Sequence, residues 1–170
     1  MDPLVPLLRR FHEKDVRFVV IGVAGINYYA TGAGTTFTTR DRDLLLPLDP
    51  EALLRAWTAC DELALSLAIG EEPLDVPRDR WLAERVISTR SVVRATNGRD
   101  LDVDLSVLMA GHDFEHVWAE RRIFLVEGVE VPVARLEHIV RSKAEAGRPK
   151  DLLFLATHRD ALKQIFAKGE

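Results

Sequence analysis

The chain has 170 residues, of which 47% are hydrophobic and 29% are charged, a composition typical of one globular domain over residues 1–170. Its formal charge of −4 argues against binding to nucleic acid through overall charge, so we expect no DNA binding, although a local basic site remains open. No apolar run approaches the roughly 18 residues that span a bilayer. The order of charges at the N-terminus does not fit a signal peptide, and the single cysteine, Cys60, favours a reducing cytoplasm without membrane attachment.

The first part of the sequence predicts an N-terminal helix and then two strands, each followed by a helix. Apolar residues at helical spacing predict an amphipathic helix at the N-terminus. "RFVVIG" (17–22) predicts a buried strand that Gly22 ends, with a helix directly after it. "TGAGTTFTT" (31–39) predicts a flexible loop, and "RDRDLLLPL" (40–48) the second strand. "DPEALLRAWTACDEL" (49–63) predicts a helix with an aspartate N-cap and proline at its first position.

The second part of the chain predicts hairpins and two closing helices. "GEEPLDVPRDR" (70–80) reads as a surface connection, and "SVVRATNGRDLDVDLS" (91–106) as a hairpin with a two-residue type I′ turn at Asn97-Gly98. A short helix near 113–120 and a hairpin over 122–133 should follow, and helices over 135–146 and 149–166 close the chain. This irregular order predicts an α+β fold, with a mixed, mostly antiparallel sheet flanked by helices.

Two pairs of aspartates fall on predicted strands. Because alternate residues of a strand share one face, Asp41 and Asp43 should point the same way, with Thr39 beside them, and Asp102 and Asp104 should form a second pair. If the two strands are neighbours in the sheet, three or four carboxylates converge, and a divalent cation such as Mg²⁺ would neutralise them. The alternative is that they are polar faces of two separate, half-exposed strands.

A lysine interrupts the apolar stripe of the 135–146 helix. Lys143 stands where the spacing of Leu136, Ile139 and Val140 requires an apolar residue. Its ammonium group either reaches outward to solvent or points inward at the carboxylates or at a phosphate. Arg148 and Lys150 follow at the junction of the last two helices, as further cations of such a site or as part of a solvated turn.

A short histidine pattern invites a different reading. "HDFEH" (112–116) matches the H-x-x-E-H pattern of inverted zinc peptidases. Because the pattern is short and degenerate, we interpret these residues as part of a short packed helix rather than a metal site. His12, His138 and His158 are expected on helix surfaces.

Several motifs occur in an order that resembles a known superfamily. A strand ending in Gly22, a helix, a loop and then Thr39, Asp41 and Asp43 before apolar residues resemble the polymerase-β-like nucleotidyltransferases. In that superfamily a third acid lies on a neighbouring strand, and "VDLS" (103–106) places Asp104 there, with Asp102 as the weaker candidate. "VEGVEVPVARLEHIVRSKAEAGRPKDLLFL" (126–155) resembles the small bacterial branch that includes AbiEii/AbiGii-type toxin nucleotidyltransferases.

The resemblance implies transfer of an NMP from an NTP such as ATP to a hydroxyl of an RNA end or a protein, with Mg²⁺ or Mn²⁺ as cofactor. Asp41 and Asp43 would hold the metal on the triphosphate, and Asp104 would complete a second metal site and help to deprotonate the acceptor. It also implies a toxin that pairs with an antitoxin. The phosphates would be contacted by Gly22, Thr39, Lys143, Arg148 and Lys150.

The chain also departs from the pattern of that superfamily. Val23 stands where a second small residue is usual, Phe37 replaces an arginine, and the loop before Asp41 is longer than usual. These departures are the reason for an alternative function, in which the chain is a weakly active or inactive nucleotidyltransferase-like binding module or an antitoxin-like partner protein.

Overall fold

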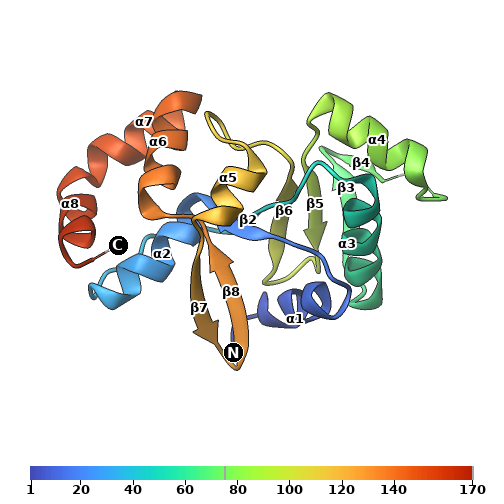
Figure 1. The fold of residues 1–170 in the computed structure, drawn as a ribbon, viewed down its shortest axis with the longest axis horizontal. Helices are drawn as coiled ribbons and strands as arrows, with labels where there is room; N and C mark the ends of the chain where they lie inside the picture. The colour runs from blue at the N-terminus through green and yellow to red at the C-terminus, as the bar shows by residue number, and fades with distance from the viewer. Residues whose placement is uncertain (75, 170) are drawn as a thin grey trace.

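The computed structural model describes residues 1–74 and 76–169, and within these residues the strands form one eight-stranded mixed sheet (Figure 1). Its strand order is β4-β3-β5-β6-β2-β1-β8-β7. Only two of the neighbouring pairs that the described residues form, β1 with β8 and β2 with β6, are parallel. The strands are β1 (Val19–Ile21), β2 (Asp41–Leu45), β3 (Ser66–Ile69), β4 (Glu72–Pro73), β5 (Val93–Thr96), β6 (Asp102–Ser106), β7 (Arg122–Val126) and β8 (Val129–Val133). The predicted α+β fold is confirmed.

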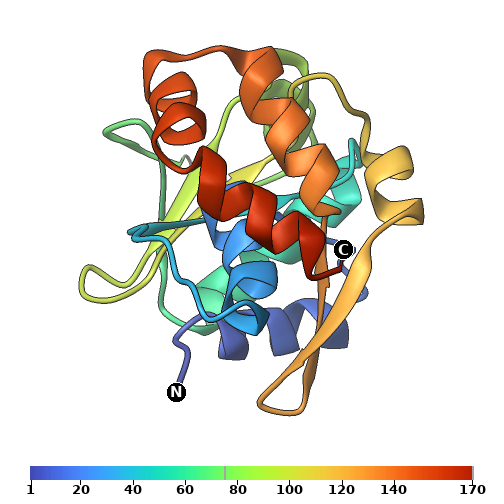
Figure 2. The same ribbon diagram turned by 90° about the vertical axis from the view of Figure 1, so that its left-hand side faces the viewer.

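The helices gather in two groups at the two ends of the sheet. In Figure 1, α1, α3 and α4 lie towards the right, and α2, α6, α7 and α8 lie towards the left. Figure 2 looks at this left-hand end, with α6, α7 and α8 facing the viewer. The helices are α1 (Val5–Glu13), α2 (Gly22–Gly32), α3 (Pro50–Glu62), α4 (Arg80–Thr89), α5 (Phe114–Ala119), α6 (Leu136–Ala146), α7 (Pro149–Thr157) and α8 (Arg159–Ala167).

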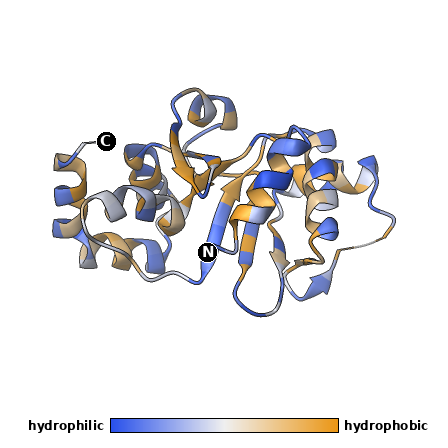
Figure 3. Ribbon diagram, turned by 90° about the horizontal axis from the view of Figure 1, so that it is seen from below, coloured by the Kyte–Doolittle hydropathy of each residue, from blue (hydrophilic) through white to orange (hydrophobic). Residues whose placement is uncertain are grey.

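The core lies between the sheet and these helices. Phe11 of α1, Leu44 of β2 and Trp57 of α3 are among its largest buried side chains. The apolar stripes read from the sequence are therefore buried, and Figure 3 shows hydrophobic residues on the central strands and an alternation of hydrophobic and hydrophilic residues along α8. Along the described chain, no helix is both long enough and apolar enough to cross a membrane.

Local signals placed most elements correctly. Asp49 caps α3 by accepting a hydrogen bond from the amide of Glu51, as its position before Pro50 predicts. Gly147 ends α6 with a φ of 61°, in the left-handed region that glycine adopts most easily. The second hairpin turns at Glu127 and Gly128, as expected.

Three expectations were wrong. The segment 70–80 is not only a surface connection, because β4 forms within it and α4 begins at its end. The helix expected over 149–166 is two helices that meet at His158, a break that lets Leu162 and Ile165 of α8 turn into the core. The first hairpin has a connection over residues 97–101 instead of a two-residue turn.

The wider turn has a local cause. The side-chain oxygen of Asn97 accepts hydrogen bonds from the amides of Arg99, Asp100 and Leu101. An asparagine side chain that bonds to the following backbone replaces the tight turn with a longer loop. This change of turn alters the pairing of β5 with β6, which matters for the site below.

Candidate active site

The two aspartate pairs lie side by side at the centre of the sheet. Parallel pairing of β2 with β6 puts Asp41 opposite Asp102 and Asp43 opposite Asp104. The strands continue from these acids into Leu44 and Leu45 on β2 and Leu105 on β6, which are all buried. The leucines therefore anchor both strands in the core and hold the carboxylates where the strands begin.

Gly22 lies directly against one of these carboxylates. β1 runs antiparallel to β2 with Ile21 opposite Asp43, and the chain then turns into α2 at Gly22 with a φ of 66°. A Cβ atom on residue 22 would overlap Oδ2 of Asp43, at a separation shorter than real contacts allow. Only glycine therefore allows this approach, which also brings the N-terminus of α2 to the carboxylates.

The pKa of the Asp43 carboxyl group is raised. Burial, together with the negative charges of Asp104 and Asp41, raises its pKa to about 6, while Lys143 and Lys150 act in the opposite direction. The charges of Asp104 and Asp41 thus affect Asp43 more strongly than the opposing charges of Lys143 and Lys150 do. A cation bound among the acids would relieve that repulsion.

Arg94 is a residue of this site that sequence reasoning missed. It lies on β5 opposite Asp104, and its guanidinium donates to both carboxylate oxygens, with Nε–Oδ1 and Nη2–Oδ2 distances of 2.8 and 3.0 Å. Its Nη2 also lies 3.2 Å from Oδ2 of Asp41. These contacts raise the pKa of Arg94 above its usual value, the hydrogen bond with Asp104 being the largest cause. The expected two-residue turn concealed this pair, since that turn would have placed Arg94 opposite Leu101.

Asp102 takes no part in the cavity. Its carboxylate accepts a hydrogen bond from the hydroxyl of Thr96, the residue opposite it on β5. Asp41, Asp43 and Asp104 line the cavity, and Asp102 is not among the lining residues that the structure describes. Of the two acids on β6, the geometry thus favours Asp104 for the site.

Lys143 points inward rather than to solvent. Its side chain is 13% exposed, and Nζ lies 3.3 Å from Oδ1 of Asp151 and 5.1 Å from the centre of the Phe154 ring. Asp151 is itself buried and accepts a second, 2.6 Å hydrogen bond from Nε of Arg148. Burial by itself would raise the pKa of Asp151, but the hydrogen bonds and charges of Arg148 and Lys143 lower it. Asp151 is a second residue that sequence reasoning missed, although it is the acid of the "GRPKD" junction (147–151).

These residues line one cavity of about 690 Å³ between the sheet and the α6–α7 pair. Thr39 lies on its wall, with its hydroxyl donating to the carbonyl of Asp41 over 3.1 Å. Arg148 and Lys150, both exposed, stand at its rim. The cavity thus brings together the three acids Asp41, Asp43 and Asp104 and the five residues expected to contact phosphates, but not Asp102. It adds polar residues that the sequence did not indicate, which are Arg90, Ser106, Ser142 and Asp151.

The loop that departs from the superfamily pattern is held in place by packing. Asn27 of α2 accepts from the amide of Phe37 and donates to its carbonyl. The Phe37 ring is buried against Phe154 and His158. Phe37 therefore serves as a packing residue between this loop and α7, and Val23 lines the cavity as an apolar residue.

The donor set fits a hard divalent cation. Three carboxylates from two adjacent strands face one open cavity, and Asp43 gains from a cation because its charge is otherwise unfavourable there. Mg²⁺ prefers oxygen ligands of this kind, completed by water and phosphate. Arg94 already contacts two of the three acids, so a bound cation would share Asp41 and Asp104 with it.

Comparison with known proteins rests on the fold. No protein-family model matches the sequence, and no curated protein matches it either. Among solved structures, the solution structure of the antibiotic-resistance factor ANT(2'')-Ia superposes with a TM-score of 0.57 and 16% identity, over 99% of this chain and 85% of that chain. This chain has a nucleotidyltransferase fold.

Two further structures support that statement. The crystal structure of ANT(2'')-Ia in complex with adenylyl-2''-tobramycin has a TM-score of 0.56 and 15% identity, over 97% of this chain and 86% of that one. An antigenic nucleotidyltransferase-like protein from Paracoccidioides brasiliensis has a TM-score of 0.54 and 12% identity, over 96% of this chain and 73% of that one. Identities this low establish the fold and leave the activity to the site.

Proposed function

We propose that this protein transfers a nucleotidyl group from an NTP to a hydroxyl acceptor, with Mg²⁺ or Mn²⁺ as cofactor. In this reaction the acceptor oxygen forms a bond to the α-phosphorus, the bond from that phosphorus to the bridging oxygen breaks, and pyrophosphate leaves. The observation that carries the proposal is the convergence of Asp41, Asp43 and Asp104 on one cavity of a nucleotidyltransferase fold.

The carboxylates have distinct proposed roles. Asp41 and Asp43 would hold the cation that binds the triphosphate, and Asp104 would share a second cation and take up the proton of the acceptor hydroxyl. Divalent ions bound there would stabilise charge on the attacking and leaving oxygens. Arg94 would orient Asp104, because its two hydrogen bonds hold both oxygens of that carboxylate.

The opposite wall of the cavity supplies positive groups for the phosphates. Lys143, held between Asp151 and Phe154, would reach the triphosphate, with Arg148 and Lys150 at the rim. The N-terminus of α2 at Gly22 offers backbone N–H groups and the positive end of the helix dipole. Thr39 also lines the cavity, with its hydroxyl bonded to the carbonyl of Asp41.

The acceptor is proposed from the charge of the rim. The ANT(2'')-Ia complex contains adenylyl-2''-tobramycin, whose aminoglycoside part is cationic. Arg90, Arg148 and Lys150 are exposed basic residues that line the present cavity beside its carboxylates, and they would disfavour such a molecule. An RNA end or a protein hydroxyl is the better match, and an assay with tobramycin as acceptor serves as the comparison.

The decisive experiment follows label from each α-³²P-labelled NTP into a cell extract, with Mg²⁺ or Mn²⁺. Wild type should label a product, and Asp41→Asn and Asp104→Asn should lose more than 100-fold of that activity. Asp102→Asn is the matched control. Asp102 lies on β6, as Asp104 does, but its carboxylate is bonded by Thr96 and does not line the cavity. Equal labelling by wild type and Asp104→Asn would refute the proposed role of this site.

A second candidate function rests on Arg94 and on the departures from the superfamily pattern at Val23 and Phe37. Arg94 already pairs with two of the three acids, Asp41 and Asp104. These features fit a nucleotidyltransferase-like binding module or an antitoxin-like partner. Calorimetric titration with each NTP and Mg²⁺ separates the two functions. Tight binding that requires both Mg²⁺ and Asp43 favours the enzyme, and absence of binding favours the module.

The narrower proposal is that the enzyme is a toxin of the AbiEii/AbiGii type. The motifs of residues 126–155 support it. Induced expression should then arrest growth with wild type and not with Asp43→Asn, at equal protein levels. An antitoxin partner would co-purify with the protein and relieve the arrest.

A further inference from the structure

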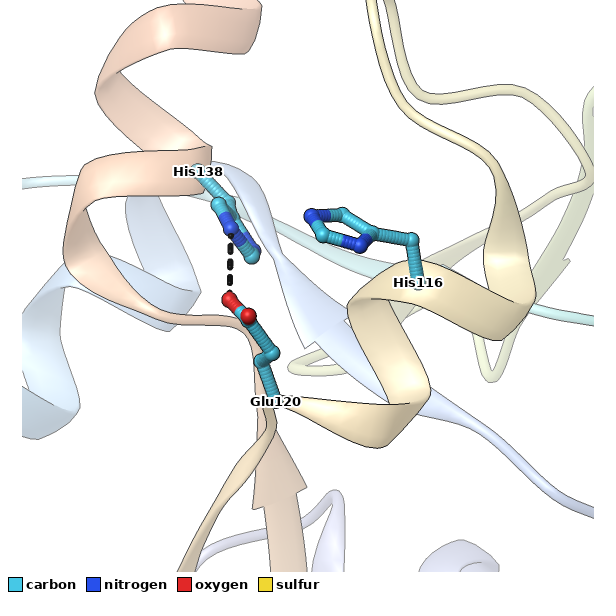
Figure 4. Close-up of side chains that lie close together, drawn as sticks. All are labelled: His116, Glu120 and His138. Carbon is cyan, nitrogen blue, oxygen red and sulfur yellow. Dashed lines mark ion pairs between the residues drawn. The ribbon is translucent and has the colours of Figure 1, made fainter.

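A second cluster of ligand-type side chains lies outside the cavity, between α5 and α6. His116 lies on α5, Glu120 follows that helix, and His138 lies on α6. One ligand atom from each side chain lies within 4.8 Å of the ligand atoms of the other two. Figure 4 shows the three side chains facing a common space, with Glu120 reaching up towards the two rings.

The structure corrects one expectation here. His138 is not on a helix surface, because only 5% of it is exposed. The "HDFEH" pattern supplies His116 but not the glutamate of the cluster, since Glu115 forms a bidentate pair with Arg17. The third ligand-type group is Glu120, one helical turn after His116, which the pattern does not contain.

His138 is the unusual member of the cluster. Its Nε2 lies 3.2 Å from Oε2 of Glu120, while its Nδ1 is buried and has no hydrogen-bond partner among the described residues. A buried imidazole nitrogen without a partner is costly. The other nitrogen of the ring, Nε2, is the one that faces the Glu120 carboxylate and is placed as a ligand atom of the cluster. Arg135 lies farther from the same Glu120 oxygen, at 3.9 Å.

Two more histidine rings surround His138. The ring centres of His112 and His116 lie 4.9 and 5.1 Å from that of His138. Neutral imidazole is the form of histidine that binds metal.

We propose that His116, Glu120 and His138 bind a divalent transition-metal ion of the Zn²⁺ class, at a site distinct from the carboxylate cavity. Two imidazole nitrogens and one carboxylate oxygen are a common ligand set for Zn²⁺, at bond lengths of about 2.0–2.2 Å, with water in the fourth position. Mg²⁺ prefers an all-oxygen set. The exposed positions of His116 and Glu120 leave room for that water.

The position of this site gives the ion a structural role. It would join α5 to α6, and both segments continue into walls of the cavity. Met109 and Ala110 precede α5, and Ser142 and Lys143 follow His138 on α6. An ion at this junction would hold the two walls at a constant separation, whatever reaction the cavity performs.

The test uses the full-length protein after treatment with a chelator. Titration with Zn²⁺ by calorimetry, and with Co²⁺ by visible absorption, should give one tetrahedral site per chain and a thermal midpoint that rises with Zn²⁺. His116→Gln and Glu120→Gln change exposed side chains and should each weaken Zn²⁺ binding at least tenfold, and His138→Gln should do the same. His12→Gln is the matched control, because its ring lies near Glu130 and away from the cluster.

Two further arms separate this site from the carboxylates. Millimolar Mg²⁺ should not compete with Zn²⁺, and Asp43→Asn should keep full Zn²⁺ affinity. The proposal is overturned if wild type binds no Zn²⁺, if His116→Gln and Glu120→Gln bind as wild type does, or if Asp43→Asn removes the binding. None of these outcomes depends on nucleotidyl transfer, so failure of the proposed function would leave this test intact.

Discussion

The backbone at residue 22 passes so close to Asp43 that a side chain has no room there. A Cβ atom would overlap Oδ2 of Asp43, and the φ of 66° is unfavourable for any other residue. We expect Gly22→Ala to lower the free energy of unfolding by about 2–4 kcal/mol and to displace the Asp43 carboxylate.

Chemical denaturation and Mn²⁺ binding measure the two effects of Gly22→Ala. Gly34→Ala is the control, because Gly34 also has a positive φ, 75°, but a Cβ atom added there would have no neighbouring atom within 4 Å. Strain alone would affect stability in both variants. Metal binding that falls in Gly34→Ala as much as in Gly22→Ala would contradict the specific role of residue 22.

The raised pKa of Asp43 makes stability depend on pH. Because its pKa is about 6 in the folded protein and 3.8 ordinarily, the group favours folding when protonated, below about pH 4, and this contribution is lost as the pH rises to about 6. Asp43→Asn imitates the protonated form. We expect the variant to match wild type near pH 4 and to be more stable by up to about 3 kcal/mol above pH 6, without metal.

Denaturation of wild type and Asp43→Asn between pH 4 and 7.5, in the presence of a chelator, tests this predicted pH dependence of stability. Addition of Mg²⁺ at pH 7.5 should then stabilise wild type more than Asp43→Asn, since the variant lacks one of the three carboxylates that would hold the cation. A stability difference between the two proteins that does not change with pH would show that the carboxyl group titrates normally.

Arg94 competes with a cation for two of the three acids. Removing its charge by Arg94→Gln should strengthen Mn²⁺ binding, because Asp41 and Asp104 are then free of a positive neighbour. Since the guanidinium is 43% exposed, solvent screens its effect to about 1 kcal/mol, or roughly fivefold in affinity. Titration of Mn²⁺ measured by water-proton relaxation checks this, and weaker binding would mean that the orientation of Asp104 by Arg94 outweighs its competition with the metal.

At the scale of elements, α6 and α7 are joined by a buried ion pair. Lys143 of α6 and Asp151 of α7 are 13% and 1% exposed, and Arg148 adds a second cation to the same carboxylate. Asp151→Asn would leave Lys143 buried without its anion, and we expect a loss of about 3 kcal/mol in the free energy of unfolding. Arg141→Gln breaks the exposed pair with Glu137 on the same helix and should cost less than about 0.5 kcal/mol.

The two variants are compared by urea denaturation at one pH. A double variant, Lys143→Met with Asp151→Leu, should recover much of the stability, since it removes both charges together. Equal effects of Asp151→Asn and Arg141→Gln would show that the buried pair does not hold the two helices.

Elements also show where sequence reasoning stops. The existence of the first hairpin followed from alternating residues around Asn97 and Gly98, but its register did not. The side chain of Asn97 accepts hydrogen bonds from three amides and so stabilises a wider turn. Because of this wider turn, Arg94 pairs with Asp104. A change of turn shifts every pair of a hairpin, so an error of a few residues in a loop hides a whole interaction.

At the scale of the molecule, the cavity combines both signs of charge. The chain has a formal charge of −4, and exposed basic residues, Arg90, Arg148 and Lys150, line the cavity together with its carboxylates. Binding of Mg·ATP should therefore weaken as salt rises from about 50 to about 500 mM, because salt screens exposed charges. The double variant Arg148→Gln with Lys150→Gln should weaken binding about tenfold and flatten the salt dependence.

Fluorescence titration with an ATP analogue measures this, and Arg99→Gln is the matched control. Arg99 is an exposed arginine in the 97–101 connection and does not line the cavity. If the salt dependence of the double variant equals that of wild type, the rim does not contribute to nucleotide binding.

The sequence by itself determined the local pieces of this protein. The strand that stops at Gly22, the leucines behind Asp41 and Asp43, the capped helix after Asp49 and the lysine on an apolar stripe can all be read from neighbouring residues. Each depends on periodicity, a turn residue or a cap, which act over a few positions along the chain.

Only the tertiary structure decided which of these pieces meet. The pairing of β2 with β6 places Asp43 beside Asp104. The wider turn of the first hairpin places Arg94 opposite Asp104. The packing of α7 on α6 buries Asp151 against Lys143. His138 joined His116 and Glu120 because α6 packs beside α5. Register and burial depend on contacts between residues far apart in the chain, and no pattern of neighbouring residues contains them.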